Sequence, residues 1–197
     1  NRQVPPQEDQ YRLRSSGRRT SIMDLNHVLI IDSFLTPKEC NKIIQMYASL
    51  PSRVLGDHSG YEDWSVHINS EKLKFLVKKL EKVSTKYSKK FPEVAYLSRS
   101  VLDECRIKLF RPGKHFVHWH ADHIPTSPTR ILGLMIYLSD HQCGTEFFNG
   151  DVVRSKQGRL IMWPSSFTHT HRGQKCPENK NRYLFSGYYE YIITQKM

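Results

Sequence analysis

The chain has 197 residues, with 30 Lys or Arg against 19 Asp or Glu, which gives a formal net charge of +11 with histidine neutral. This length and an apolar share of 38% suit one domain with a core, and they exclude wholesale disorder. The longest apolar run, residues 131–138, is far shorter than the roughly 20 residues of a membrane span, so nothing here crosses a bilayer. The first residue is Asn, which indicates a fragment or a processed protein and leaves a removed signal peptide open.

The chain begins with a segment that lacks the pattern of a folded element. Residues 1–24 are polar and basic and show no apolar period, which is typical of an arm or linker. From residue 28 the pattern changes to a short β-branched run, which predicts a buried strand. We therefore place one domain over residues 25–197.

Two helices are predicted in the first half of this domain. Thr36 and Glu39 have the spacing of a capping box, which predicts a helix start there. Apolar residues follow at helical spacing up to Leu50, which we expect to be buried. Residues 71–90 hold eight lysines and two glutamates around a second apolar stripe, which predicts a helix with a lysine-rich outer face. We interpret this face as solvated, with an acidic partner as the alternative.

The second half of the chain has the pattern of short strands. They are predicted at residues 105–110, 116–122, 131–138, 152–153, 160–163, 167–171 and 183–193. Helices first and short strands afterwards favour an α+β chain whose catalytic part is a β-sandwich or jelly roll.

The four cysteines, at positions 40, 105, 143 and 176, contain no C-x-x-C pair. This spacing argues against a disulfide scaffold and against a zinc site built from four thiolates. We expect reduced thiols that pack as small apolar side chains, and a cytoplasmic location is favoured.

The histidines carry most of the chemical information. Six of the ten lie within residues 115–123 and 169–171. On a strand, residues two apart face the same side, so His120 and Asp122 project together. With one distant histidine they would form the facial triad of a non-haem Fe(II) site, which leaves three coordination positions open. A lone H-x-D arises often by chance, and strand alternation leaves both His169 and His171 open as the distant ligand.

Several motifs in a fixed order raise the specificity of this pattern, although each is weak alone. Together they resemble the Fe(II)/2-oxoglutarate-dependent dioxygenases, closest to the prolyl 4-hydroxylase-like branch, from residue 28 to residue 191. The motifs are residues 28–36, Phe110-Arg111-Pro112-Gly113 with Phe116, Arg130, residues 137–140, residues 143–147, residues 158–165, His171-Arg172-Gly173 and Arg182-Tyr183. The chain departs from the branch at Phe110, where a tyrosine is common.

The resemblance implies a fold and a metal site. The fold would be a double-stranded β-helix, or jelly roll, supported by N-terminal helices. Fe(II) would be held by His120, Asp122 and His171, because Gly173 and the step to Arg182 fit the family pattern better with His171 than with His169. His169 would then be a neighbouring group of the site.

The resemblance also implies a cosubstrate site. Arg182 would hold the far carboxylate of 2-oxoglutarate, since a guanidinium grips a carboxylate with two parallel hydrogen bonds. Lys180 is the weaker alternative for this anchor, and Thr145 and Tyr137 would add contacts. Ascorbate is expected as a reductant. The aromatic residues available either to wall the pocket or to pack in the core are Trp64, Trp119, Phe147, Phe148 and Trp163.

Several functions compete on this basis. The leading hypothesis is a dioxygenase that hydroxylates prolyl residues of a peptide or protein with release of succinate and CO2. Oxidative demethylation of nucleic acid on the same iron centre is the second hypothesis, slightly favoured by the basic charge and opposed by the lack of a base-stacking motif. A non-catalytic metal-binding jelly roll is the third, although it would not need Arg182. A zinc hydrolase would also need a general base that we cannot place.

Overall fold

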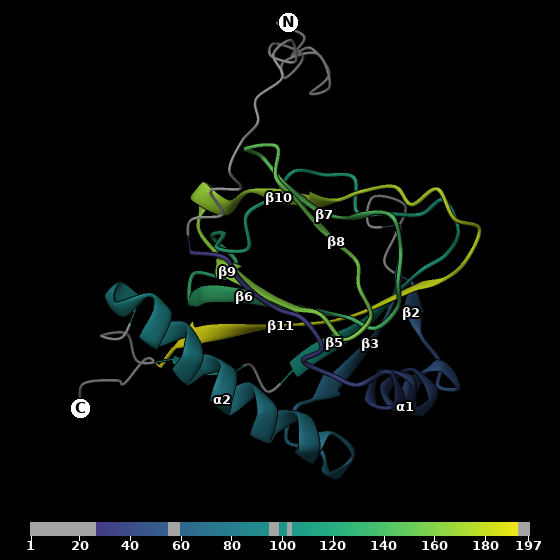
Figure 1. Ribbon diagram of the computed structural model, residues 1–197, viewed down its shortest axis with the longest axis horizontal. Helices are drawn as coiled ribbons and strands as arrows, with labels where there is room; N and C mark the ends of the chain where they lie inside the picture. Colours follow the sequence, from purple (N-terminus) through teal and green to yellow (C-terminus); the bar gives the residue numbers. More distant parts are fainter. Residues whose placement is uncertain (1–26, 55–59, 95–98, 102–103, 193–197) are drawn as a thin grey trace, which may run out of the picture.

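The computed structural model describes residues 27–54, 60–94, 99–101 and 104–192. The predicted arm, residues 1–24, lies outside the described residues. Two antiparallel sheets face each other, and two α-helices cover the outer face of the larger sheet (Figure 1). The predicted α+β architecture with a double-stranded β-helix core and supporting N-terminal helices is confirmed.

The large sheet carries most of the fold. Its strand order is β1–β9–β6–β11–β5–β3–β2, with β4 paired to the end of β11, and every pairing is antiparallel. The strands are β1 (Leu29–Ile31), β2 (Arg53–Val54), β3 (Glu62–His67), β4 (Arg99–Val101), β5 (Glu104–Phe110), β6 (Arg130–Tyr137), β9 (Leu160–Pro164) and β11 (Arg182–Tyr191).

The small sheet has the order β10–β7–β8, formed by β7 (Gly144–Phe147), β8 (Val152–Arg154) and β10 (His171–Gly173). A turn at residues 149–151 joins β7 to β8, with the side chain of Asn149 accepting from the amide of Asp151 at 3.0 Å. Gly144 sits so close to β8 that a Cβ would lie 1.9 Å from the carbonyl oxygen of Val153, so only glycine fits there.

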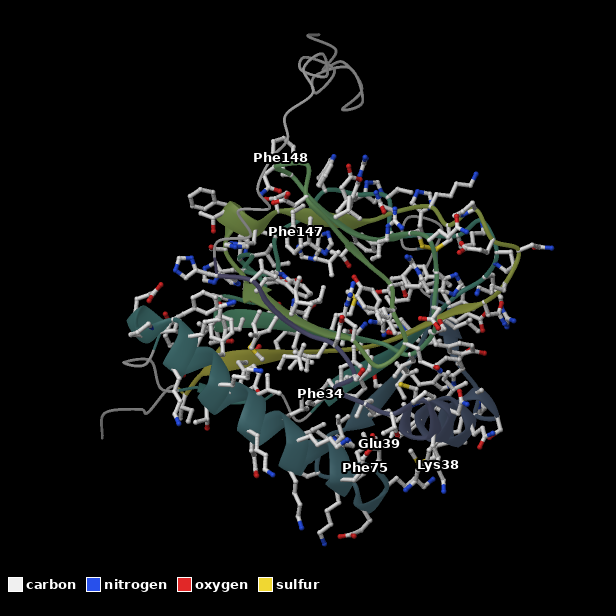
Figure 2. All side chains as sticks on the ribbon, viewed as in Figure 1. Phe34, Lys38, Glu39, Phe75, Phe147 and Phe148 are labelled. Atoms are coloured by element: carbon white, nitrogen blue, oxygen red, sulfur yellow. A yellow bond between two sulfur atoms is a disulfide. The ribbon has the colours of Figure 1, made fainter. Side chains whose placement is uncertain are left out.

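The helices lie where the sequence pattern predicts them. Helix α1 (Pro37–Ala48) starts with the predicted capping box between Thr36 and Glu39. Helix α2 (Lys74–Lys90) follows a 3-10 turn, η2 (Glu71–Leu73), and the Nζ of Lys79 lies 2.7 Å from the carboxylate of Glu39. Figure 2 shows Phe34, Glu39 and Phe75 gathered where the two helices approach each other. Among the described residues, no helix is long and apolar enough to span a membrane.

The core has two parts, separated by the large sheet. One part fills the space between this sheet and the helices, and the other lies between the two sheets. Successive residues of one strand alternate between the parts, as period-2 geometry requires: on β9, Leu160 and Met162 pack toward the helices, whereas Ile161 and Trp163 pack toward the small sheet. Trp64, one of the aromatic residues available to wall a pocket, belongs to the helix side.

Three local predictions are wrong. Residues 116–122 form no strand but a loop, and the only pairing within it is a bridge between His120 and His171. Residues 167–171 form a 3-10 turn, η4 (Phe167–His169), before β10 begins, so His169 and His171 do not share one strand face. The last residue of the predicted helical stripe, Leu50, is 45% exposed because α1 ends at Ala48.

The expectation of four reduced thiols is also wrong. Cys143 and Cys176 form a disulfide that joins the start of β7 to the loop before β11, while Cys40 and Cys105 are buried and form no disulfide. The two bonded residues lie 33 positions apart, so no local sequence spacing predicts their pairing.

The structure also contains short 3-10 and strand elements that the sequence analysis did not predict. A 3-10 turn, η3 (Pro92–Val94), ends the segment after α2. Strand β3 pairs with β5 over six residues, and β2 pairs with β3, which widens the large sheet toward residue 53. The sequence did not predict β3 because its residues, Glu-Asp-Trp-Ser-Val-His, begin with two charges and show a poor alternation of apolar and polar side chains.

Candidate active site

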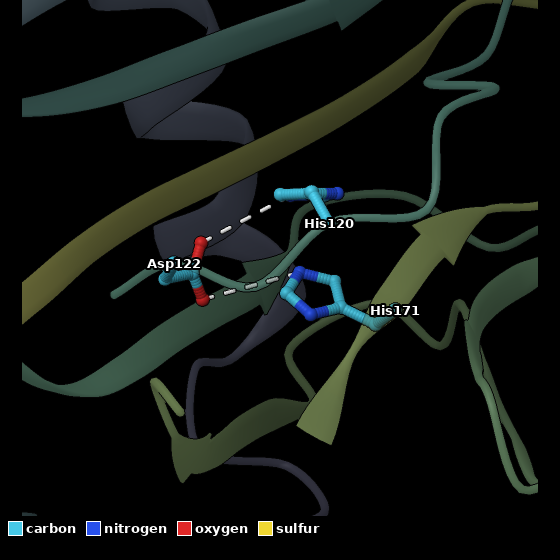
Figure 3. Close-up of side chains that lie close together, drawn as sticks. All are labelled: His120, Asp122 and His171. Atoms are coloured by element: carbon cyan, nitrogen blue, oxygen red, sulfur yellow. Dashed lines mark ion pairs between the residues drawn. The ribbon is translucent and has the colours of Figure 1, made fainter. Parts of the chain in front are cut away.

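Three side chains of metal-ligand type converge between the two sheets. His120 and Asp122 come from the loop between β5 and β6, and His171 is the first residue of β10 (Figure 3). The Nε2 of His120 lies 3.9 Å from Asp122 Oδ1, and the Nε2 of His171 lies 4.0 Å from Asp122 Oδ2. The three ligand atoms all lie within 4.8 Å of one another, which is the spacing of ligands around one ion.

Backbone hydrogen bonds hold the loop in this position without a strand. The amide of His120 donates to the carbonyl of His171 at 3.0 Å, and the amide of His171 donates back at 2.9 Å. The amide of Asp122 donates to the carbonyl of Ser165 at 3.1 Å, directly after β9. The loop is therefore tied to β9 and β10, which brings its two side chains to the distal histidine.

The two imidazoles are oriented as metal ligands. The Nδ1 of His120 lies 3.1 Å from the carbonyl oxygen of His118, and the Nδ1 of His171 lies 3.0 Å from that of His169. A carbonyl oxygen only accepts, so each Nδ1 carries the hydrogen and each Nε2 presents a lone pair toward Asp122. Burial, followed by repulsion from His171, lowers the pKa of His120 to about 4, so its imidazole is neutral at neutral pH.

The carboxylate of Asp122 is fixed by two donors. Asp122 is 4% exposed, the indole Nε1 of Trp163 donates to its Oδ2 at 3.1 Å, and the hydroxyl of Tyr188 donates to its Oδ1 at 3.2 Å. Burial raises the pKa of Tyr188, which keeps this hydroxyl protonated and able to donate. Two imidazoles and one oriented carboxylate are the donor set that suits Fe(II) with open positions, so the residues present fit this metal.

Arg182, the first residue of β11, supplies a buried cation in the same cavity. It is 2% exposed, its Nη1 contacts Cys143 Sγ at 3.1 Å, and its guanidinium lies over the ring of Phe110 at 4.6 Å. Its Nε and Nη2 have no hydrogen-bond partner among the described residues. A buried guanidinium with two unused donors fits a carboxylate, which is what a cosubstrate such as 2-oxoglutarate would bring. Lys180, the alternative anchor, is exposed.

Tyr137 and Thr145 line the cavity beside Arg182. The hydroxyl of Tyr137 lies 2.8 Å from Thr145 Oγ1 and 2.9 Å from the carbonyl oxygen of Val153. Burial raises the pKa of Tyr137 to about 12, so its hydroxyl keeps its proton at neutral pH. Both side chains therefore present polar atoms at the end of the cavity where a carboxylate would meet Arg182.

The structure separates the predicted site residues into two groups. It brings His120, Asp122, His171, Arg182, Thr145 and Tyr137 to one cavity, together with Phe116, Trp163 and Tyr188. His169 does not line this cavity: its Nδ1 lies 2.9 Å from Thr168 Oγ1, and its ring meets that of Phe147 edge-on. Phe148, another residue available to wall the pocket, is 55% exposed and lies at the outer end of β7 (Figure 2).

The sequence prediction missed Tyr188, which orients Asp122. A signal was available, because Leu184, Ser186 and Tyr188 are spaced two apart on one predicted strand, in step with Arg182 directly before it, and must face the same side. All four line the cavity.

A comparison with models of protein families shows which family this part of the chain resembles. Residues 107–190 match the model of the 2OG-Fe(II) oxygenase superfamily. This segment contains the three clustered side chains and Arg182, and the match confirms the predicted resemblance to this superfamily over these residues. No curated protein sequence matches the chain.

Solved structures of prolyl hydroxylases share the fold of this chain at low sequence identity. The viral collagen prolyl hydroxylase of Paramecium bursaria Chlorella virus-1, in complex with 2-oxoglutarate, has a TM-score of 0.64 and 15% identity over 87% of this chain and 100% of that one. A prolyl-4-hydroxylase of Pseudomonas putida has a TM-score of 0.65 and 14% identity over 85% and 94%. A Trichoplax adhaerens prolyl hydroxylase, in complex with a peptide of hypoxia inducible factor, has a TM-score of 0.65 and 16% identity over 84% of both chains.

Proposed function

We propose that the chain is an Fe(II)- and 2-oxoglutarate-dependent dioxygenase that hydroxylates prolyl residues of a peptide or protein. The observation that carries the proposal is one cavity that contains both a metal-ligand cluster, His120, Asp122 and His171, and an unpaired buried guanidinium, Arg182. Fe(II) and 2-oxoglutarate, when bound, supply the oxidising chemistry, in which 2-oxoglutarate and dioxygen become succinate and CO2 while a substrate C–H is hydroxylated.

The residues of this chain would hold and orient these groups. His120 and His171 would each bind Fe(II) through Nε2, because their Nδ1 atoms already donate to backbone carbonyls. Asp122 would supply the charged ligand, held by Trp163 and Tyr188. Three protein ligands would leave coordination positions of the metal open, which a closed structural site would not do.

Arg182 would bind the far carboxylate of 2-oxoglutarate through the two nitrogens that lack partners. Tyr137 and Thr145 would add neutral hydrogen bonds at the same end of the cavity. The small sheet and the side chain of Phe110, over which Arg182 lies, exclude water from this end and so strengthen the ion pair.

The prolyl part of the proposal is supported by the fold, since the similar structures named above include three prolyl hydroxylases, one of them with a peptide bound. Oxidative demethylation of nucleic acid is the second candidate, and the net charge of +11 favours it. A non-catalytic metal-binding module is disfavoured, because it would have no use for a buried, unpaired Arg182. Ascorbate as reductant stays a prediction.

The test is turnover of 2-oxoglutarate to succinate with Fe(II), measured with proline-containing peptides and with methylated oligonucleotides. We expect succinate to form with the peptides, and we expect His120→Ala and Asp122→Ala to abolish its formation because each removes a ligand. Retained turnover in both variants would refute the ligand assignment, and turnover with oligonucleotides alone would replace the substrate assignment.

His169 gives the matched control for the distal ligand, since it lies two residues from His171 and outside the cavity. We expect His171→Ala to lose iron and His169→Ala to retain it, as measured by metal content after dialysis. Iron loss only in the His169 variant would reverse this choice.

A further inference from the structure

The cavity contains a lysine to which the proposed chemistry assigns no role. Lys108 lies on β5, two residues before Phe110, and lines the same cavity as His120, Asp122 and Arg182. Its neighbours Ile107 and Leu109 belong to the core on the helix side of the sheet. Strand alternation therefore directs the ammonium of Lys108 away from the helices and into the site.

Lys108 has no carboxylate partner within ion-pair distance among the described residues. The two acids whose charges act most strongly on its ammonium, Asp122 and Asp63, already have other partners. Asp63, its register partner on β3, is ion-paired to Arg106 at 2.9 Å. Asp122 accepts from Trp163 and Tyr188. The ammonium of Lys108 lies instead over the ring of Tyr61, 5.0 Å from its centroid.

With Fe(II) and 2-oxoglutarate bound, the positive charge of Lys108 would have no balancing negative charge in the site. The two positive charges of Fe(II) and the one of Arg182 are balanced by the single negative charge of Asp122 and the two of 2-oxoglutarate. Arg172, which also lines the cavity, is already paired with Glu146 at 2.9 Å. Burial lowers the pKa of Lys108 to about 8, with the attraction of Asp122 opposing that shift, so the side chain is still largely charged at neutral pH.

Lys108 is placed apart from the cosubstrate anchor along the sheet. Arg182 is the register partner of Phe110, and Leu184 is the register partner of Lys108, so the two cations lie two residues apart along the strands. Two residues of a strand span roughly 7 Å, so the two side chains enter the cavity from different positions along the sheet.

We propose that Lys108 binds an acidic group of the primary substrate, so that the site selects a peptide with Asp or Glu directly beside the residue that is hydroxylated. This inference rests on the proposed function for the identity of the site, and it adds the substrate class. An unpaired ammonium inside a cavity favours a carboxylate over a neutral amide of the same shape, because only the carboxylate forms a charge-assisted hydrogen bond.

The experiment is a binding titration without turnover. The full chain, loaded with Fe(II) and 2-oxoglutarate under anaerobic conditions, is titrated with N-acetylated pentapeptides centred on proline, and binding is followed by tryptophan fluorescence. The peptides carry glutamate on either side of the proline, and the matched peptides carry glutamine there. We expect the protein to bind one glutamate peptide about tenfold more tightly than its glutamine match, the size of one hydrogen bond to a charged group.

Variants assign the preference to one side chain. Lys108→Met, which keeps the length of the side chain, should abolish the preference, and Lys108→Arg should retain part of it. Lys86→Met, which removes an exposed lysine of α2, should leave it unchanged. Far-UV circular dichroism and the affinity for Fe(II) confirm that each variant is folded.

The possible outcomes separate this inference from the proposed function. Equal binding of the glutamate and glutamine peptides, or no binding of any of them, would overturn the role of Lys108. A weaker affinity for 2-oxoglutarate in Lys108→Met with peptide binding unchanged would also overturn it, by assigning Lys108 to the cosubstrate. A preference for a methylated oligonucleotide that Lys108→Met removes would replace the acidic peptide with nucleic acid. The titration is repeated on the metal-free chain. A preference for the glutamate peptide there would support the role of Lys108 even if the chain formed no succinate from 2-oxoglutarate.

Discussion

The two faces of the large sheet use the same strands for different purposes. On the helix side, β5 and β11 place apolar residues, such as Ile107 and Phe185, in a continuous core. On the other side, the alternate residues of the same strands include Lys108, Arg182 and Tyr188, which line the cavity. One face therefore contributes stability and the other binding groups, and the two-residue period of the strands keeps these contributions apart. Substitutions on the two faces should have separable effects.

The largest effect is expected on the helix side. Ile107 is 1% exposed and packs in the core under the helices. Ile107→Ala should lower the free energy of unfolding by about 2–5 kcal/mol, because it removes buried methyl groups and leaves a cavity. Urea unfolding measures this loss, and Fe(II) affinity, measured below the unfolding transition, should stay unchanged.

Ile107→Val is the matched control, with an expected loss of about 0.5–1.5 kcal/mol. A change in Fe(II) affinity as large as the change in stability would show that the two faces are not separable.

Arg182 should show the opposite behaviour. Its guanidinium is buried with two nitrogens that lack hydrogen-bond partners, and buried donors left unsatisfied destabilise the folded state by about 1–3 kcal/mol. Arg182→Met should therefore unfold at an equal or higher urea concentration than the parent protein in the absence of 2-oxoglutarate. At a concentration one hundred times its dissociation constant, 2-oxoglutarate should stabilise the parent by about 2.7 kcal/mol and the variant hardly at all.

Lys180→Met is the control for this prediction, because Lys180 is exposed on the loop before β11. Loss of the 2-oxoglutarate effect in that variant, and not in Arg182→Met, would move the anchor to Lys180.

Gly133 offers a way to disturb the proposed metal ligand Asp122 from within the sheet. A Cβ at this position of β6 would lie 2.8 Å from Asp122 Oδ2 and 2.8 Å from Cε2 of Trp163. Gly133→Ala should push the carboxylate of Asp122 away from the indole of Trp163. We expect Fe(II) binding to weaken by roughly 10–100-fold, the usual effect of losing a hydrogen-bond partner of a metal ligand. Metal titration measures this change. Unchanged affinity would mean that the Trp163 hydrogen bond does not orient Asp122.

How far the sequence predicts the structure depends on how local the responsible interaction is. The capping box of α1 and the amphipathic stripe of α2 depend on residues within one or two turns, and both predictions are confirmed. The alternation of side chains that predicts β5 is also a local pattern. The period-2 argument placed His120 and Asp122 on one side, but the structure achieves this with a loop that is held by hydrogen bonds to Ser165 and His171. The two side chains converge for a tertiary reason that no local pattern contains.

The same distinction accounts for the choice of His171 and for the disulfide. His171 lies in the cavity because η4 turns the chain before β10, and strand alternation had left His169 equally open. The family pattern, and not the geometry of a strand, favoured His171. The pairing of Cys143 with Cys176 depends on the approach of β7 to the loop before β11, where the amide of Gln174 donates to the carbonyl of Gly144 at 2.9 Å. Long-range contacts of this kind have no period in the sequence.

The smallest effect is expected at the edge of the helix side, where α1 and α2 differ. The side chain of Thr36 caps α1 by accepting from the amide of Glu39 at 3.2 Å, whereas the N-cap of α2, Leu73, makes no side-chain hydrogen bond. Thr36→Ala should lower the free energy of unfolding by about 1 kcal/mol, because it leaves an amide of the first turn without its partner. Thr36→Ser should keep nearly all of the stability, since serine offers the same oxygen. Fe(II) and 2-oxoglutarate affinities should not change in either variant, because α1 packs against the face of the sheet that bears no ligand; a loss of metal affinity in Thr36→Ala would show that the helix layer positions the site as well as stabilising the fold.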